Sequence, residues 1–161
     1  MKLELANKIL RNERYSKLVK KLEALEKNRI FCGHDMEHFM SVARIAVMLC
    51  AEKSLEVDKD VIYSAALLHD IGRVEEYING SPHDLAGAET AAEILDEIGC
   101  PEDKKADIIK LILSHRCYGG EESSPESIFY TADKLSRLCF CCKAKDKCNW
   151  PENKRNYEIG I

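Results

Sequence analysis

Apolar residues recur at helical spacing along most of the chain. Between residues 2 and 28, leucines and an isoleucine alternate with Lys, Arg and Glu in a pattern that predicts one amphipathic helix or a pair of them. Asp35 can cap a helix whose apolar positions run from Phe39 to Leu49. Residues 61–70 are nearly all apolar, which predicts a central helix that Gly72 ends.

The second half of the sequence continues the helical pattern. Residues 78–82 have the composition of a loop. Three further helices are predicted, from 83 or 84 to about 98, from 102 to about 115, and from 125 to about 138. We find no alternating strand pattern and no internal repeat. The sequence therefore predicts an all-α fold, a compact bundle of five to seven helices.

Length and charge narrow the possible partners. A chain of 161 residues is long enough for one domain with a core, which we expect over residues 1–138, with the helix of residues 2–28 packed on it. Residues 139–161 are expected to form a cysteine-rich C-terminal tail. The net charge of -4 argues against duplex nucleic acid as a partner. Small anionic substrates remain possible, because a bound metal supplies positive charge locally.

The sequence contains no run of about 20 apolar residues, and its first residues lack the apolar core of a signal peptide. We therefore expect a cytoplasmic protein without a membrane partner. In that setting the eight cysteines are expected to be reduced thiols or metal ligands rather than disulfides. The oligomeric state is not indicated by any pattern.

Each of the five histidines lies at a predicted helix end or beside an acidic residue. For any one of them alone, a surface or capping role is the favoured interpretation. His38 begins one helix, whereas His69 and Asp70 end the apolar central helix, where a buried polar pair needs a partner. Imidazole and carboxylate ligands suit zinc, iron or manganese, and Asp133 in a later apolar helix can complete the set.

In chain order, His38, the pair His69-Asp70 and the distant Asp133 resemble the pattern of the HD-domain superfamily of metal-dependent phosphohydrolases, over about residues 34 to 138. Some branches of that superfamily add two histidines, and His83 and His115 match their positions. The resemblance implies two divalent Fe, Mn or Zn ions bridged by Asp70. It also implies a small phosphorylated substrate such as a nucleotide.

Two such ions lower the pKa of a bridging water and neutralise the charge that develops on a phosphoryl group, so no separate nucleophile is needed. We find no convincing Ser-His-Asp or Cys-His arrangement. The expected catalytic groups are Asp70, His83, His115, Arg73, Arg116 and Lys134. The cationic residues Arg73, Arg116 and Lys134 lie close in sequence to expected ligands and can bind phosphate oxygens. We favour the two arginines, because Asp133 is expected to direct Lys134 away from the metal.

Other residues have open roles. His34 is interpreted as a residue on the substrate side or one that orients a ligand. Tyr118 and Tyr130 are candidates either for stacking on a substrate or for packing. The families that this chain resembles hydrolyse nucleoside monophosphates, deoxynucleoside triphosphates, cyclic dinucleotides or dinucleoside polyphosphates. The chain lacks the Gly-Tyr-Pro extension of the cyclic dinucleotide hydrolases, which argues against that substrate.

Two alternative functions remain open at this point. The first is a regulatory or sensor module that keeps the metal site and binds a nucleotide without turnover. The complete ligand set favours an enzyme over such a module. The second is a di-iron oxygenase-like protein, which the sequence neither requires nor excludes.

Four of the eight cysteines lie between residues 139 and 148. Cys139 and Cys142 have a separation that is common in metal sites, and Cys148 can supply a third thiolate, which suggests a zinc or iron-sulfur site. The alternatives are buried apolar thiols under a C-terminal cap or a redox-labile cluster.

Overall fold

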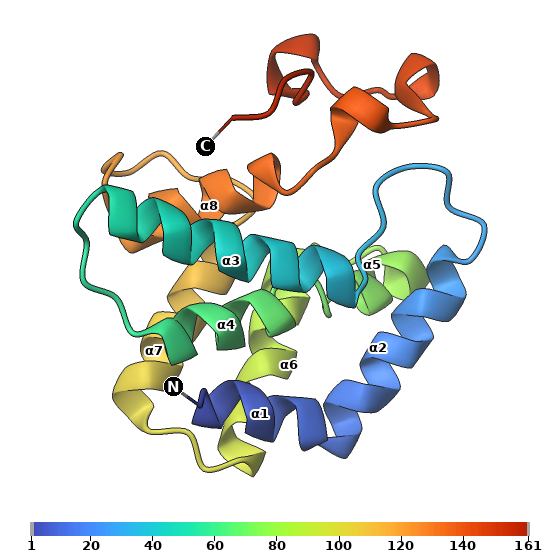
Figure 1. Cartoon of the computed structure of the whole chain (residues 1–161). Helices are drawn as coiled ribbons and strands as arrows, with labels where there is room; N and C mark the ends of the chain where they lie inside the picture. The colour runs from blue at the N-terminus through green and yellow to red at the C-terminus, as the bar shows by residue number, and fades with distance from the viewer. Residues whose placement is uncertain (1, 161) are drawn as a thin grey trace.

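The computed structural model describes residues 2–160, and within that range it contains α-helices and short 3-10 helices but no strand. The α-helices are α1 (Glu4–Arg11), α2 (Glu13–Glu26), α3 (Met36–Glu52), α4 (Lys59–Leu68), α5 (Arg73–Asn79), α6 (His83–Glu97), α7 (Glu102–Ser114) and α8 (Pro125–Leu135). The 3-10 helices are η1 (Cys139–Cys141), η2 (Lys145–Lys147) and η3 (Glu152–Lys154). The predicted all-α bundle is confirmed (Figure 1).

The N-terminal segment forms two helices, the second of the two alternatives that the sequence left open. Asn12 separates them, because its side chain accepts a hydrogen bond from the backbone N–H of Tyr15 and so caps α2. At the other end of α1, the carboxylate of Asp60 in α4 accepts hydrogen bonds from the backbone N–H groups of Leu5 and Ala6, at 2.8 and 2.9 Å. These bonds satisfy donors that have no partner within α1 and attach it to α4.

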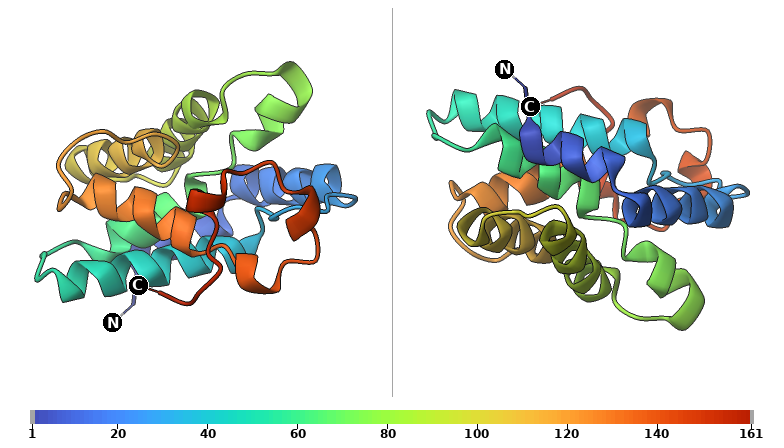
Figure 2. Two further views of the ribbon diagram at one scale, coloured as in Figure 1. Left: turned by 90° about the horizontal axis from the view of Figure 1, so that it is seen from above. Right: turned by 90° about the horizontal axis from the view of Figure 1, so that it is seen from below.

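Helix α4 lies at the centre of the fold, as its apolar sequence predicts. It packs against α1, α3 and α7, and α8 packs in turn against α3 and α7 (Figures 1 and 2). The helix ends at Leu68, so His69 and Asp70 lie in the turn that follows and are both buried. The central helix thus carries a polar pair into the core at its C-terminal end.

Helix α5 was not predicted. The central helix ends at Leu68 rather than at Gly72, and Gly72 instead precedes this short helix, of which only Val74 is buried. One buried position gives no helical period to recognise in the sequence. Gly80, with a φ of 73°, ends α5 in the left-handed conformation that favours glycine.

The C-terminal tail, which begins after α8, lies on the side of the bundle opposite α1 (Figure 1). Helix α8 stops at Leu135, three residues before the predicted end, and the tail that follows contains only the three 3-10 helices. In the described part of the chain, no helix has the length and apolar character needed to cross a membrane.

Candidate metal centre

Four side chains from three parts of the chain converge on one point. His38 comes from the first turn of α3, His69 and Asp70 from the turn after α4, and Asp133 from α8, and one ligand atom of each lies within 4.8 Å of the others. Nε2 of His69 is 3.0 Å from Oδ2 of Asp70, and Nε2 of His38 is 3.4 Å from that oxygen and from Oδ1 of Asp133. The structure therefore brings together the four residues expected as the first ligand group.

A second group shares Asp70 with the first. His83 begins α6 and His115 follows α7, and the Nε2 atom of each lies 3.7 Å from Oδ1 of Asp70. The two oxygens of this carboxylate thus face different groups, with Oδ2 toward His38 and His69 and Oδ1 toward His83 and His115. A carboxylate in this position can contact a cation in each group.

The hydrogen bonds of the four imidazoles leave Nε2 free to bind a cation. Nδ1 of His69 and of His115 donates to a carbonyl one turn earlier, and Nδ1 of His83 lies 3.0 Å from Oε1 of Glu76. Ser136 donates its hydroxyl proton to the carbonyl of Asp133, so its oxygen accepts from Nδ1 of His38 at 3.2 Å. Such partners fix the ring orientation and place the proton on Nδ1.

Two close contacts favour a cation in each group. The Nε2 atoms of His38 and His69 lie 3.2 Å apart, and those of His83 and His115 lie 3.1 Å apart. When both rings are protonated on Nδ1, two lone pairs face each other in each contact, which a positive charge between them relieves. Oδ1 of Asp133 is also buried without a hydrogen-bond partner. The donor set fits divalent transition metals.

The pKa values of Asp70 and His38 also favour positive charge here, whereas burial lowers the pKa values of His69 and His83. Burial raises the pKa of Asp70, but His69 and Arg73 more than compensate and hold it well below the usual range. For His38, burial lowers the pKa, while the carboxylates of Asp133 and Asp70, each with an oxygen 3.4 Å from Nε2, raise it to about 9. His38 thus lies between two carboxylates, where positive charge is favoured.

The three cationic side chains expected at the site have different hydrogen-bond and ion-pair partners. Arg73 donates to Oδ1 of Asp70 at 2.7 Å, and Arg116 is half-exposed and pairs with Asp84 at 3.3 Å. The prediction that Asp133 directs Lys134 away from the site is wrong. Nζ of Lys134 lies 2.6 Å from Oδ2 of Asp133 and 3.1 Å from the carbonyl oxygen of His115, so Asp133 draws this lysine into the site.

His34 is buried and also faces the centre. Its Nε2 lies 3.9 Å from Oδ2 of Asp70, while Glu26 of α2 accepts hydrogen bonds from both its Nδ1 and its backbone N–H. Tyr77 of α5 donates to the same glutamate at 2.6 Å. His34 lies in the loop before α3 rather than on its helical face, so its orientation depends on Glu26, which the sequence does not indicate.

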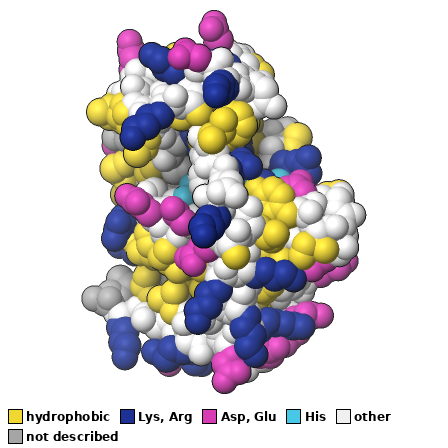
Figure 3. All heavy atoms as spheres, turned by 90° about the vertical axis from the view of Figure 1, so that its right-hand side faces the viewer, with side chains coloured by type: hydrophobic (Ala, Val, Ile, Leu, Met, Phe, Trp, Pro, Cys, Tyr) yellow, Lys and Arg dark blue, Asp and Glu magenta, His cyan; other side chains and the backbone are white. Residues whose placement is uncertain are grey.

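The metal centre opens into a pocket with a volume of about 290 Å³. Its wall includes His83, His115 and Asp133, together with residues that the sequence analysis missed. The missed residues are Arg137, Trp150, Pro151 and Lys154. Figure 3 shows one side of the molecule, on which histidine reaches the surface in small patches next to charged side chains. Most of the missed residues belong to the tail, whose position no helical pattern predicts.

The two tyrosines have separate positions. Tyr130 lines the metal pocket, as expected for a residue that could stack on a substrate. Tyr118 lies outside it, and its hydroxyl is 2.7 Å from the hydroxyl oxygen of Ser124, next to α8. Tyr118 is therefore not part of the metal pocket, and its packing role stays a prediction.

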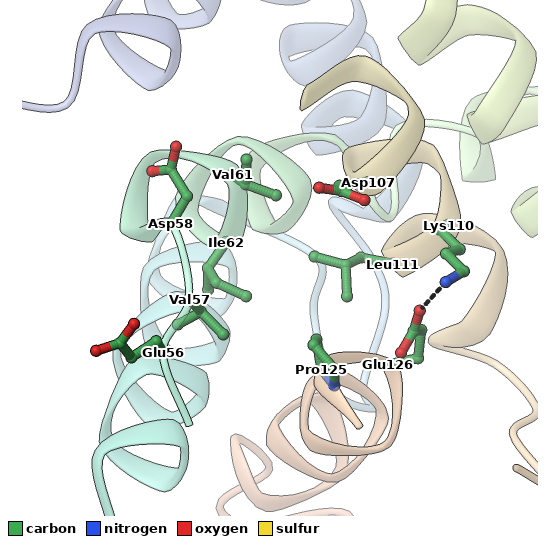
Figure 4. Close-up of a pocket in the computed structure, with 10 residues that line it drawn as sticks. All are labelled: Glu56, Val57, Asp58, Val61, Ile62, Asp107, Lys110, Leu111, Pro125 and Glu126. Carbon is green, nitrogen blue, oxygen red and sulfur yellow. Dashed lines mark ion pairs between the residues drawn. The ribbon is translucent and has the colours of Figure 1, made fainter. Parts of the chain in front are cut away.

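A second pocket lies among the residues before and within α4, α7 and the start of α8 (Figure 4). Val61, Ile62 and Leu111 line it together with an ion pair of 2.8 Å between Lys110 and Glu126. Neither of the two groups of potential metal ligands among the described residues contributes to this pocket. Carboxylates line this pocket too, but among the described residues they do not converge on one point as the ligands of the metal centre do.

The cysteines are all free thiols in the structure. Within residues 2–160, the two groups of converging ligand atoms contain no cysteine, so Cys139, Cys142 and Cys148 do not form a ligand set in this conformation. Cys139 and Cys148 instead line a pocket with Cys32 and Trp150. The cysteine metal site stays a prediction.

The family comparison agrees with the geometry. A family model described as the HD domain matches residues 35–138, a range that includes His38, the His69-Asp70 pair and Asp133. The chain belongs to the HD-domain family. It is therefore a metal-dependent hydrolase, of the phosphohydrolase type in general.

Individual relatives extend the comparison. An uncharacterised protein from Clostridium beijerinckii is 42% identical over 153 residues, which cover 95% of this chain and 96% of that protein. Ribonuclease Y of Thermotoga petrophila is 35% identical over 125 residues, but this HD protein spans only 22% of its length. The crystal structure of a predicted HD superfamily hydrolase from an uncultured Thermotogales bacterium is 26% identical, with a TM-score of 0.61, over 87% of this chain and 80% of that one.

Proposed function

We propose that this HD-domain protein hydrolyses a phosphoester or phosphoanhydride bond in a small phosphorylated molecule, with nucleotides as the substrate class. The proposal rests on the orientation of the Asp70 carboxylate. Its Oδ2 faces the pair His38 and His69, and its Oδ1 faces the pair His83 and His115. In the proposal His38, His69, Asp70 and Asp133 hold one divalent ion, and Asp70, His83 and His115 hold a second. The ions supply an activated water and neutralise charge on the phosphoryl group.

The protein's own side chains have defined tasks in this reaction. The buried rings of His69 and His115 exclude bulk solvent from the inner side of the site. Lys134, at the pocket wall, is placed to bind a phosphate oxygen, because its ammonium group already lies beside a ligand carboxylate. Arg73 and Arg116 line the same pocket and provide further donors. These groups bind and orient the phosphate while His34, held by Glu26, faces Asp70.

The assembly of the ligand set is tested by elemental analysis of anaerobically purified protein. We expect two ions of iron, manganese or zinc per chain in the wild type and none at this centre in Asp70→Ala. His34→Ala is the matched control, since it removes a buried imidazole near Asp70 that is not a proposed ligand; we expect it to keep both ions. Equal loss in both variants would show that the first ligand group is misassigned.

Turnover is tested separately on the metal-loaded protein. A panel of nucleoside monophosphates, nucleoside triphosphates and dinucleoside polyphosphates is assayed with Mn²⁺, Fe²⁺ or Zn²⁺. We expect hydrolysis in the wild type and none in Asp70→Ala. Nucleotide binding without hydrolysis in any of these conditions would instead support the sensor module.

A further inference from the structure

The C-terminal tail is fixed to the helix that carries a proposed metal ligand. The side-chain amide of Asn156 donates to the carbonyl oxygens of Lys134 and Arg137, at 2.7 and 2.9 Å. Carbonyls at the end of a helix have no partner within the helix, so this asparagine satisfies them from outside. The tail therefore holds a defined position relative to Asp133, although it lies beyond the residues that match the family model.

Arg155 positions the single tryptophan of the chain at the mouth of the pocket. Its guanidinium donates to the carbonyl oxygens of Trp150 and Cys148, each at 2.7 Å. On the other side, the guanidinium of Arg137 lies 4.2 Å from the centre of the Trp150 ring, and Nζ of Lys134 lies 5.8 Å from it. Trp150 thus packs over the cationic side chains of Arg137 and Lys134, which line the metal pocket.

Arg137 has a charge that the protein itself leaves poorly paired. Its side chain is only 9% exposed, and its Nε atom is buried without a hydrogen-bond partner. It approaches Oδ2 of Asp133 at 3.8 Å, but Lys134 already contacts that oxygen at 2.6 Å. A buried cation is stable only with an anionic partner, and a guanidinium suits the oxygens of a phosphate.

The charge of the pocket also favours an anionic ligand. Five of the lining residues, Arg73, Arg116, Lys134, Arg137 and Lys154, are cationic and only Asp133 is acidic, on a chain whose net charge is -4. The pocket volume of about 290 Å³ lies at the lower end of the range for sites that bind small molecules. Both features match one compact and highly charged ligand.

We propose that the tail forms the outer wall of the substrate site, where Arg137, Trp150 and Lys154 bind the terminal phosphate of a small molecule. The inference rests on the proposed function for the location of the reaction, and it deepens that function by naming the substrate as a small terminal phosphomonoester or polyphosphate. A continuous strand of RNA, whose phosphates are internal diesters, does not fit a site closed on one side by the tail.

The wall can be tested without turnover, because Trp150 is the only tryptophan and its fluorescence reports on the pocket. Inorganic phosphate is titrated into the Mn²⁺-loaded full chain. We expect a saturable fluorescence change whose Kd rises about tenfold in Arg137→Gln and about threefold in Lys154→Gln. Lys147→Gln, an exposed tail residue outside the pocket, is the matched control and should bind phosphate as the wild type does.

Unchanged phosphate affinity in both pocket variants would overturn the proposal, and Lys154→Gln keeps this test valid if Arg137→Gln fails to fold. Phosphate binding that depends on Arg137 and Lys154 in a protein that hydrolyses nothing would support the wall and contradict the proposed function.

A kinetic comparison separates the small substrate from RNA. We expect the wild type to hydrolyse p-nitrophenyl phosphate and to leave the internal bonds of a ten-nucleotide RNA intact. Trp150→Ala should raise KM for p-nitrophenyl phosphate about tenfold and change kcat less than twofold. Preferential cleavage of the RNA by the wild type, or an unchanged KM in Trp150→Ala, would refute the assigned role of the tail.

Discussion

Gly72 is the point at which the turn carrying His69 and Asp70 meets helix α6. A Cβ atom at Gly72 would lie 2.0 Å from the carbonyl oxygen of His83, 2.4 Å from the backbone nitrogen of Gly87 and 2.7 Å from its Cα. All three atoms belong to the backbone of α6, so no side chain can rotate to make room. We predict that Gly72→Ala displaces the first turns of α6 and, with them, His83.

The size of the effect follows from these distances. Carbon atoms make their best contacts at about 3.5 to 4.0 Å, so α6 would have to retreat by more than 1 Å. Overpacking in a close-packed interior costs about 1–3 kcal/mol and occasionally more. Because a whole helix must move, we expect Gly72→Ala to lower the free energy of unfolding by about 3 kcal/mol. The same shift takes Nε2 of His83 away from His115, now 3.1 Å distant, and from Asp70.

The assay combines urea unfolding, followed by circular dichroism, with elemental analysis of the folded protein. Gly87→Ala is the matched control on the opposite side of the same contact, where a Cβ would meet its nearest atoms at 3.4 to 3.6 Å, an ordinary contact. We expect Gly87→Ala to keep both ions and the wild-type stability, and Gly72→Ala to keep at most one ion. A Gly72→Ala protein with the wild-type urea midpoint and metal content would refute this account.

Two further predictions concern buried groups next to α2. The bond to His34 and other contacts outweigh burial and lower the pKa of Glu26 from 4.5 to about 2, so its stabilisation is present above pH 4.5 and lost as the pH falls toward 2. At 1.36 kcal/mol per pKa unit, we expect Glu26→Gln to be less stable than the wild type at pH 7 by on the order of 3 kcal/mol. The difference in urea midpoint between the two proteins should narrow below pH 4.5. A difference that stays constant with pH would contradict this. The Tyr15 hydroxyl is buried without a hydrogen-bond partner, so Tyr15→Phe should raise the free energy of unfolding by about 1 kcal/mol. Tyr77→Phe loses the hydrogen bond to Glu26 and should lower the free energy of unfolding by about 1 kcal/mol. The opposite order of the two variants in thermal unfolding would refute the assignment.

The sequence predicted most helices because their apolar faces repeat over several turns. The helix over residues 61–70 was placed correctly at the centre, since a helix that is apolar on most sides has to be buried. Helix α5 was missed because it buries only Val74. The end of α8 was placed three residues too late, because Leu138 continues the apolar pattern although it is exposed. Periodicity thus identifies helices that pack on the core and gives little information about short connecting ones.

The metal centre was predictable as a set of residues but not as a geometry. The order of His38, His69-Asp70 and Asp133 indicated the ligands, and the structure brings them together. The inward direction of Lys134 could not be inferred from its neighbour, because it depends on the carbonyl oxygen of His115, which follows another helix. Contacts between segments that are distant in sequence decide which charged groups enter the site.

Arg137 is a pocket residue that the sequence did not indicate at all. In the sequence it is one of 24 basic residues, with no motif to distinguish it. In the structure its side chain is only 9% exposed, it stacks on Trp150 of the tail, and its buried Nε atom lacks a hydrogen-bond partner. A protein that only needed to fold would gain little from burying that charge, because the desolvation penalty is offset only by a well-placed anion. Arg137 lies beside the ligand Asp133 and under Trp150 of the tail, and in the proposed function the phosphate of the substrate is the anion that offsets its charge.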